Sequence, residues 1–429
     1  MKDVSSWGRL ERSAHRTVPL LESDSLAAAI AGSPLPGLAY GMGRSYGDAC
    51  LNPGGTLWET GRLDRFASFD AATGLLDCEA GVLLGDIQRT FAPRGWMLAV
   101  SPGTQFVTVG GAIANDVHGK NHHARGTFGE HVDALTLVRT DRRVIECGPQ
   151  RESGWFAATV GGLGLTGVIA RATLRLARVP GPWFEVQTLP FRTLADFFRY
   201  SDESEAAWEH TVAWIDCLSA EGRGIFFRGR PVPSDAPPPR EHRRRLPVDL
   251  PLVNRFSLRA FNMLYHAKQS RAPQQSVQHY SRFLYPLDGI AHWNRIYGRR
   301  GFYQYQSVVP QGSRVEATRE MLTRISRSGE GSFLAVLKTF GRREAPGMLS
   351  FPMHGVTLAV DFANAGERTA KLLASLDDVV RDAKGRLYPA KDARMPAALF
   401  EAGYPGLQEF KAYRDPGISS AMSRRLMGS

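Results

Sequence analysis

Long hydrophobic runs and paired cysteines are both missing from this sequence of 429 residues. No apolar stretch reaches the roughly 18 residues that a membrane-spanning helix needs, and residues 1–9 lack the apolar core of a secretory signal. The four cysteines are scattered without a C-x-x-C pair, which is typical of a reducing compartment and argues against a structural zinc site. We therefore expect a protein of the cytoplasmic side that contains no metal.

The composition is that of an ordinary globular protein, with 43% hydrophobic and 22% charged residues. Its length favours two domains. The formal net charge is +11, which either describes a basic surface or indicates an anionic partner. No nucleic-acid-binding signature accompanies this charge. A phosphate-bearing small molecule or a membrane surface is therefore the favoured partner, and nucleic acid is not expected.

Two stretches rich in glycine and small polar residues stand out, Gly41–Cys50 and Ser101–His123. Glycine has no Cβ, so successive backbone N–H groups can approach a pyrophosphate closely and surround it. Two such stretches, separated in the sequence, predict a dinucleotide site built from loops.

The first 180 or so residues are rich in Gly, Val, Ala and short turns. Residues 168–176 alternate between apolar and polar side chains, which predicts a half-buried strand. Short helices are expected at 86–93 and 155–160. A Pro/Gly cluster at 179–183 is a candidate boundary. This part is interpreted as an α+β nucleotide-binding domain.

Aromatic-rich strand patterns follow at 211–216 and 301–309, with helical patterns at 314–325 and 367–381. They predict an antiparallel sheet flanked by helices. Residues 231–251 are too rich in proline and like charge to form a packed element, so a mobile loop is expected there. The amphipathic segment 252–265 after it either rests on anionic lipid or is an ordinary packed helix.

Two motifs have competing interpretations. Residues Gly162–Gly167 match G-x-G-x-x-G, but a helix-like segment precedes them and a strand follows, which is the reverse of the Rossmann context. His118 and His122 have the i, i+4 spacing of a metal pair, yet no acidic residue completes a known zinc motif. More simply, His118 belongs to an active-site loop.

The chain also resembles FAD-dependent oxidoreductases with a vanillyl-alcohol-oxidase-type (PCMH-type) FAD-binding domain, and within them the decaprenylphosphoryl-β-D-ribose 2′-oxidase family. The resemblance runs nearly end to end. Its motifs are Trp7-Gly-Arg, Gly43–Asp48, Gly110–His123, Gly161–Gly167, Gln304–Gln306, Tyr388–Arg394 and Arg424–Leu426.

The resemblance implies an FAD-binding domain at 1–178, completed by 386–429, and a substrate-binding domain at 179–385. It further implies a set of residues lining the FAD: Gly41, Met42, Gly43, Arg44, Ser45, Tyr46, Gly47, Asp48, Ala49, Gly103, Thr108, Val109, Gly110, Gly111, Asn115, Asp116, Val117, His118, Ile169 and Tyr388. The first loop has no histidine to tether the flavin, so dissociable FAD is expected.

Lys391, Tyr388 and His118 are the candidate catalytic residues by the same resemblance, and Gln304, Gln306, Lys338 and Lys391 the candidate substrate residues. Lys391 would bind or deprotonate a substrate hydroxyl; the alternative is a surface ion pair with its neighbour Asp392. Ala359 stands where mycobacterial members have a reactive cysteine, so covalent nitroaromatic inhibitors are not expected to form an adduct.

The implied reaction is oxidation of the C2′ hydroxyl of a polyprenyl-phosphoryl pentose to a 2′-keto sugar, the first half of an epimerisation toward the arabinose lipid of cell-wall arabinan. A quinone-like acceptor, a short-chain dehydrogenase partner and a peripheral contact with the inner face of the plasma membrane would accompany it. Two alternatives stay open: an aldonolactone or alditol oxidase acting on a free sugar, and a non-catalytic flavin- or metal-binding protein.

Overall fold

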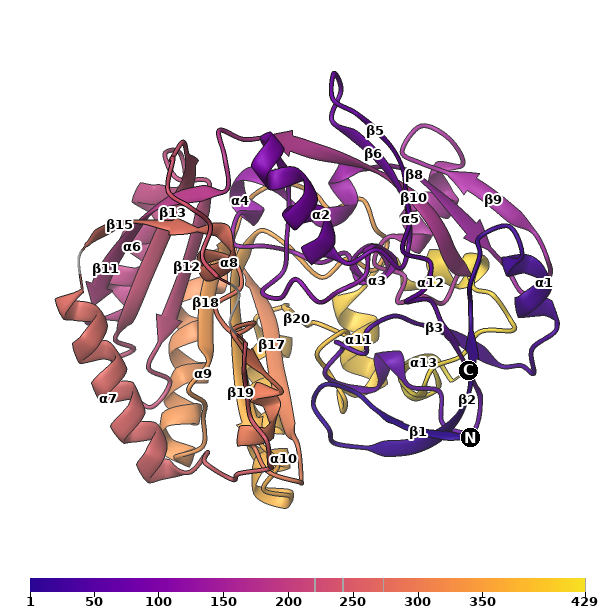
Figure 1. The fold of residues 1–429 in the computed structure, drawn as a ribbon. Coiled ribbons are helices and arrows are strands. Elements are labelled where there is room, and N and C mark those ends of the chain that lie inside the picture. The colour runs from indigo at the N-terminus through magenta and orange to yellow at the C-terminus, as the bar shows by residue number, and fades with distance from the viewer. Residues whose placement is uncertain (220, 241–242, 273, 429) are drawn as a thin grey trace.

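The structure is a computed structural model that describes residues 1–219, 221–240, 243–272 and 274–428. Within these ranges the strands form sheets of four, six and eight strands and one two-stranded pair. Figure 1 shows the four- and six-stranded sheets in one half of the molecule and the eight-stranded sheet in the other. The mixed helices and antiparallel sheets are those expected from the sequence.

The first half is built on two small sheets. The four-stranded sheet has the order β1-β2-β4-β3 and consists of β1 (Lys2–Ser5), β2 (Arg12–Pro19), β3 (Gly37–Tyr40) and β4 (Thr56–Glu59). The six-stranded sheet consists of β5 (Phe66–Asp70), β6 (Leu75–Glu79), β7 (Trp96–Leu98), β8 (Val132–Val138), β9 (Val144–Cys147) and β10 (Val168–Arg178). In β10 the even-numbered residues from 168 to 176 are buried, while Arg171, Thr173 and Arg175 are more exposed. The alternation predicted a strand correctly.

Short helices surround these sheets. They are α1 (Leu26–Ala31), η1 (Asp48–Cys50), α2 (Leu84–Phe91), η2 (Ala92–Arg94), α3 (Val109–Ala114), α4 (His122–Arg125), η3 (Phe128–His131) and α5 (Ser153–Thr159). The expected short helices correspond to α2 and α5. Because α5 precedes residues 162–167 and β10 follows them, the G-x-G-x-x-G string does not lie in a Rossmann strand-to-helix turn.

The second half is an antiparallel sheet in the order β15-β11-β13-β12-β18-β19-β17-β20. Its strands are β11 (Trp183–Phe191), β12 (His210–Ile215), β13 (Gly224–Val232), β15 (Gln275–His279), β17 (Phe302–Pro310), β18 (Ala335–Phe340), β19 (Gly355–Ala363) and β20 (Arg386–Leu387). The helices are α6 (Leu194–Ser204), α7 (Arg255–Arg271), α8 (Tyr280–Phe283), η4 (Trp293–Ile296), η5 (Gln311–Ser313), α9 (Arg314–Ser328) and α10 (Glu367–Asp382). Both predicted strands and both predicted helices of this half are present.

Alternation along the strands gives this sheet two different faces. Tyr305, Leu337 and Val360 belong to the hydrophobic cluster that also contains the buried side chains of α6, α9 and α10. Their strand neighbours, including Gln306 and Lys338, therefore lie on the opposite face. That face is turned toward the first half of the molecule (Figure 1).

Two parts of the proline-rich segment, for which a mobile loop is expected, belong to strands. Strand β13 extends to Val232, and Arg244–Arg245 form β14, which pairs in parallel with β16 (Ile290–Ala291). Long-range pairing thus orders residues whose local composition opposes structure. Residues 241 and 242 of this segment lie outside the described ranges.

The C-terminal segment returns to the first half after β20. It contains α11 (Ala397–Gly403), α12 (Leu407–Phe410), η6 (Lys411–Tyr413) and α13 (Ala421–Met427), drawn in yellow beside the indigo N-terminal strands in Figure 1. Backbone hydrogen bonds join the two ends of the chain, from Gly37 N to Gly417 O at 2.9 Å and from Ala421 N to Leu51 O at 2.7 Å.

None of the helices within the described ranges is long and apolar enough to cross a membrane.

Candidate active site

A cavity of about 890 Å³ lies between the glycine-rich loops and the free face of the eight-stranded sheet. Loop 41–46, which follows β3, and loop 101–108, which leads into α3, form one side. Strands β12, β17, β18 and β19 form the other side, and Tyr388 and Lys391 reach it from the C-terminal segment. Two loops distant in the sequence are thus brought to one site, as the sequence predicts.

Most of the predicted site residues line this cavity. From the cofactor set these are Gly41, Met42, Gly43, Arg44, Ser45, Tyr46, Ala49, Gly103, Thr108, Gly110, Gly111, Asn115, Val117, His118, Ile169 and Tyr388. From the substrate set these are Gln304, Gln306, Lys338 and Lys391. Four predicted cofactor residues are not among the lining residues: Gly47, Asp48, Val109 and Asp116.

Those four residues support the cavity wall from behind. A Cβ on Gly47 would overlap the carbonyl of Asp392, and Val109 is fully buried in the core of the six-stranded sheet. Asp116 is also buried and accepts hydrogen bonds from Gly129 N at 2.8 Å and from Ser350 Oγ at 2.5 Å. Asp48 is held in an ion pair described below. These four residues therefore lie behind the lining residues, and their part in holding the cofactor stays a prediction.

The cradle depends on glycine at two positions. Gly43 has a φ of +58°, which favours glycine because a Cβ is strained there. A Cβ on Gly41 would come within 2.6 Å of Thr108 Oγ1. That hydroxyl caps α3 by accepting a hydrogen bond from Gly111 N at 3.1 Å. A larger residue at Gly41 would push into Thr108 of the second loop, and one at Gly43 would overlap the Tyr40 hydroxyl.

Two buried polar atoms on the cavity wall have no hydrogen-bond partner within the described chain, Arg44 Nε and His118 Nδ1. The guanidinium of Arg44 lies 4.2 Å from the centre of the Trp7 ring, and burial lowers its pKa. A buried cation that lacks a paired anion is costly. The donors of this cradle therefore fit a ligand with negative charge and acceptor oxygens, as FAD has in its pyrophosphate.

Lys391 projects over the face of Tyr46, with its Nζ 3.8 Å from the ring centre. Burial lowers the pKa of Lys391 to about 7, while Asp361 raises it and Lys338 lowers it. The ammonium is attracted by the electron-rich ring face, so Tyr46 fixes its position. Asp392 is paired with Arg425 at 3.1 Å, and this pairing excludes the alternative of a Lys391–Asp392 surface ion pair.

Asp361 is a fully buried carboxyl group on the same wall. It accepts hydrogen bonds from Gln304 Nε2 at 2.7 Å and from the Tyr297 hydroxyl at 3.1 Å. Burial raises the pKa of Asp361 to about 7, against the lowering effect of these two donors and of Lys391. Lys391 and Asp361 therefore share an environment in which each stabilises the charged form of the other.

His118 and Tyr388 use their polar atoms to hold the site together. Gln306 Nε2 lies 3.0 Å from His118 Nε2, and burial lowers the pKa of His118 well below its usual value. A neutral His118 accepts this bond at Nε2 and carries its proton on Nδ1. Tyr388 donates its hydroxyl hydrogen to Asn115 O at 2.8 Å and stacks on Phe351.

Two further lysines reach the cavity, Lys120 and Lys338. Lys120 Nζ donates to Leu284 O at 2.6 Å, and Lys338 Nζ donates to Gly119 O at 3.2 Å. Burial lowers the pKa of Lys338 to about 8 and that of Lys120 to about 7. Neither forms an ion pair within the described chain, so both suit an anionic group of a ligand.

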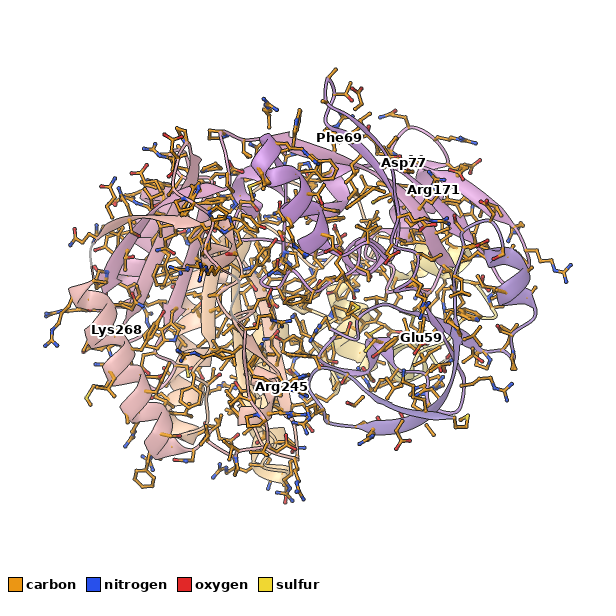
Figure 2. All side chains as sticks on the ribbon, viewed as in Figure 1. Glu59, Phe69, Asp77, Arg171, Arg245 and Lys268 are labelled. Atoms are coloured by element: carbon orange, nitrogen blue, oxygen red, sulfur yellow. The ribbon has the colours of Figure 1, made fainter. Side chains whose placement is uncertain are left out.

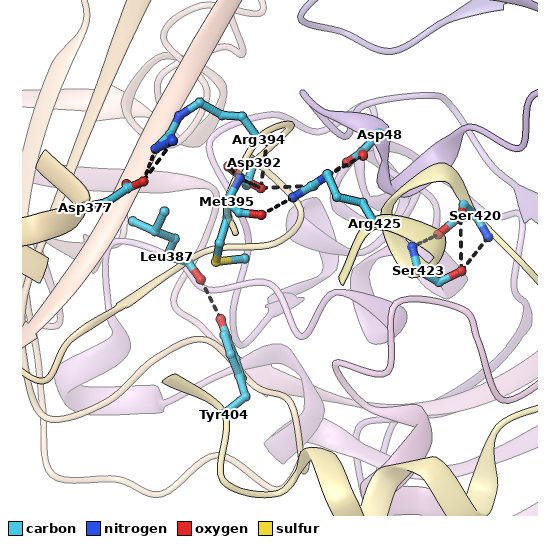
Figure 3. Close-up of polar contacts among 10 residues, drawn as sticks. All are labelled: Asp48, Asp377, Leu387, Asp392, Arg394, Met395, Tyr404, Ser420, Ser423 and Arg425. Carbon is cyan, nitrogen blue, oxygen red and sulfur yellow. Dashed lines mark hydrogen bonds and ion pairs between the residues drawn. The ribbon is translucent and has the colours of Figure 1, made fainter. Parts of the chain in front are cut away.

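An arginine from the last helix fixes the segment that carries Lys391 (Figure 3). Arg425 donates from Nε and Nη2 to the carboxylate of Asp48 at 2.9 and 2.8 Å, and Nη2 also lies 3.1 Å from Asp392. Its Nη1 donates to Met395 O at 2.6 Å. Arg425 thereby joins the first glycine loop to the residues that follow Lys391.

Sequence reasoning missed Asp361 and Tyr297. A signal for Asp361 was present in the sequence, because the side chains of β19 alternate between the two faces of the sheet. Asp361 falls on the same face as Ala359, which lines the cavity and is the cross-strand partner of Gln306. Tyr297 follows the short helix η4 and meets Asp361 only through the tertiary fold, so no local pattern indicates it.

Two other chemistries lack the geometry they need. Residues 43–47 have the G-x-S-x-G spacing of a hydrolase nucleophile elbow, but no hydrogen bond in the described ranges joins the Ser45 hydroxyl to a histidine, and the string forms a loop between β3 and η1. Nowhere in the described part of the chain do three His, Cys, Asp or Glu side chains group closely enough to hold a metal ion, the His118–His122 pair included.

The class of protein follows from this architecture together with a family match. Residues 24–148, which contain both glycine-rich loops, match the family of FAD binding domains. The match fits the cradle, its unpartnered cation and the cavity beside it. The protein is an FAD-dependent oxidoreductase.

Comparison over the whole chain identifies the family within this class of oxidoreductases. The chain is 36% identical to the decaprenylphosphoryl-β-D-ribose oxidase of Mycolicibacterium smegmatis over 99% of its own length and 97% of that protein. It therefore belongs to the decaprenylphosphoryl-β-D-ribose oxidase family. Matches to the L-gulonolactone oxidase of Mus musculus (33% identical) and the D-lactate dehydrogenase of Anaerostipes hadrus (25% identical) cover 32% and 35% of the chain, and 30% and 32% of those proteins.

Proposed function

We propose that this protein oxidises the C2′ hydroxyl of a polyprenyl-phosphoryl pentose, resembling decaprenylphosphoryl-β-D-ribose, to the 2′-keto sugar. The observation that supports this most is the position of the half-buried Lys391 on the Tyr46 ring, where the cofactor loops meet the polar face of the sheet. The full-length match to an oxidase of that lipid sugar supports the same substrate class.

FAD, when bound, supplies the acceptor for the hydride that leaves C2′. Lys391 in its neutral form receives the hydroxyl proton at Nζ, so that the C–H and O–H bonds break and a C=O bond forms. Gln306 and neutral His118 lie beside it and orient the sugar hydroxyls. Asp361 is a positioning residue that keeps the proton affinity of Lys391 from falling further.

The remaining groups of the cavity match the remaining parts of such a substrate. Lys120 and Lys338 would face the phosphate, because both are half-buried cations that line the cavity without a paired carboxylate in the described chain. An apolar arm of the cavity, lined by Val186, Trp214 and Phe227 among others, would take the first units of the prenyl chain. The FAD would lie on the lining residues of loops 41–49 and 103–118, held without a covalent bond.

The physiological setting belongs to the same proposal. Electrons would pass to a quinone-like acceptor, and a short-chain dehydrogenase partner would reduce the keto sugar to complete the epimerisation. The enzyme would work at the inner face of the plasma membrane as a peripheral protein. The division into an FAD-binding part, 1–178 with 386–429, and a substrate-binding part, 179–385, is also retained as a proposal.

Anaerobic bleaching of the flavin absorbance tests the substrate. We expect rapid bleaching by polyprenyl-phosphoryl ribose in detergent and none by free ribose or L-gulono-lactone. Bleaching by the lactone alone would instead assign the protein as an aldonolactone oxidase. A holoprotein that no sugar reduces would indicate a non-catalytic flavoprotein.

A further inference from the structure

Helix α7 has an outer face that is apolar and exposed to solvent. Phe256, Met263 and Leu264 have 82%, 56% and 65% of their surface exposed. At 100° per residue these side chains fall on one side of the helix, opposite the buried Leu258 and Asn262. Figure 1 shows α7 at the outer edge of the molecule. The helix thus packs on the sheet through one face and leaves the other exposed, and both sequence-based interpretations stay open.

The segment that leads into α7 extends this face. Val248, Leu250 and Leu252 are 54%, 39% and 47% exposed. Most other large exposed hydrophobic residues in the described ranges are dispersed along the chain, and single exposed residues are normal. A concentration of seven between residues 248 and 264, with Phe261 (40% exposed) included, is not normal, and it marks an interaction surface.

The charged residues of α7 have one sign, and Asp249 in the segment that leads into it is paired with Arg9. α7 contains Arg255, Arg259, Lys268 and Arg271 and no acidic residue, and none of the four forms an ion pair within the described chain. Lys268 lies at the outer edge of the molecule (Figure 2). An apolar stripe that runs for about 12 Å from Phe256 to Leu264, on a helix whose cations form no ion pair within the described chain, is the pattern of a helix that lies in the surface of an anionic bilayer.

The inner face of the same helix borders the active-site cavity. Phe261 and Tyr265 line the cavity together with Trp214 and Phe333. The Phe261 ring packs edge-on against Phe333 at 4.7 Å, and Tyr265 packs in the same way against Trp214 at 4.7 Å. α7 thus separates the apolar arm of the cavity from the surface described above.

We propose that α7 and residues 248–252 bind the surface of an anionic lipid bilayer. Phe256, Met263 and Leu264 enter the apolar region, and the four cations of the helix contact lipid phosphates. The apolar arm beneath α7 then opens at the bilayer, so a polyprenyl chain moves from the membrane into the cavity without crossing water. This last step rests on the proposed function, whereas the binding to lipid does not.

Flotation of the FAD-loaded protein with vesicles tests the proposal. We expect binding to phosphatidylglycerol vesicles and about tenfold weaker binding to phosphatidylcholine vesicles. Leu264→Asp is expected to weaken binding to phosphatidylglycerol by about tenfold or more. The matched control is Leu21→Asp, since Leu21 is 55% exposed but follows β2 in the other half of the molecule. Equal binding by the two variants would overturn the proposal.

Two double charge reversals distinguish the effect of cations on α7 from the effect of the net charge of the protein. Arg255→Glu/Arg259→Glu and Arg16→Glu/Arg142→Glu change the net charge equally, and the second pair lies in the first half. Only the first pair is expected to abolish flotation. Equal loss of vesicle binding in both double variants would show attraction by overall charge alone and reject the proposal. A wild-type dimer in sedimentation that does not bind vesicles, and that Leu264→Asp dissociates, would also reject it.

Flavin reduction measured in detergent distinguishes a failure of the proposed lipid binding from a failure of the proposed function. The Leu264 and Arg255/Arg259 variants are expected to reduce at the wild-type rate with detergent-dissolved polyprenyl-phosphoryl ribose, and their flavin spectra report correct folding. Lipid binding without reduction by this sugar would reject the proposed function alone. Reduction without lipid binding would reject the membrane surface alone.

Discussion

At the scale of single residues, the chemistry depends on how the protein sets the proton affinity of Lys391. Burial alone would lower the pKa far from the value of a free lysine, and the face of Tyr46 and the carboxyl group of Asp361 work against that effect. The outcome is a lysine that can be neutral near pH 7, which a proton acceptor must be.

Replacing Lys391 by alanine is expected to slow flavin reduction by about 100-fold or more, because the hydroxyl proton loses its acceptor. Single-turnover reduction followed at the flavin absorbance measures this directly. Lys371→Ala on the exposed face of α10 is the control. An unchanged rate with FAD still bound would remove Lys391 from the mechanism.

The rate of flavin reduction is expected to rise with pH through about 7, since only neutral Lys391 accepts a proton and its pKa is about 7. Asp361 raises that pKa, so Asp361→Asn is expected to move the ascending limb of the pH profile to lower pH. A purely structural role for Asp361 would lower the rate at every pH and leave the limb in place.

At the scale of elements, the strands and helices with clear periodicity were predictable. The alternation at 168–176 and the helical patterns at 314–325 and 367–381 correspond to β10, α9 and α10. The pairing of β14 with β16 was not predictable. β16 lies some 45 residues after β14 in the chain, and local composition carries no information on such pairing.

The ion-pair cluster around Arg425 is expected to be important for stability. Its side chain is 24% exposed, so Arg425→Met should cost about 2 kcal/mol of unfolding free energy, between the values for exposed and buried pairs. Urea unfolding of the holoprotein measures it, with the exposed Arg319→Met as control. The variant should also bind FAD more weakly, because Asp48 and Asp392 lose their common partner.

At the scale of the whole molecule, the sequence indicated which loops form the cavity but not which of their residues lie behind its surface. Sixteen of the twenty predicted cofactor residues line the cavity. The other four, such as Val109 in the core and Asp116 under Ser350, share the same motifs, and adjacent residues of a loop or short helix point in different directions. A motif locates a site, and only packing decides which of its side chains face the ligand.

FAD is expected to bind this assembled site without a covalent bond. The first glycine loop offers Arg44, Ser45 and Tyr46 and no histidine, so we expect acid precipitation to release all of the flavin into the supernatant. Flavin that stays with the pellet, with a matching mass increase of the intact chain, would contradict this; His118 and Cys50, which also line the cavity, would then be the positions to map.

The return of the C-terminal segment to the first half also orders events in time. Lys391 and Arg425 leave the ribosome only after every long strand of the large sheet has been translated, while the loops they close against are among the earliest residues made. A nascent chain can therefore collapse both sheets before its flavin pocket is whole. We expect a stable flavin complex to form only once the C-terminal segment is in place, so that cofactor capture is a late step of biogenesis.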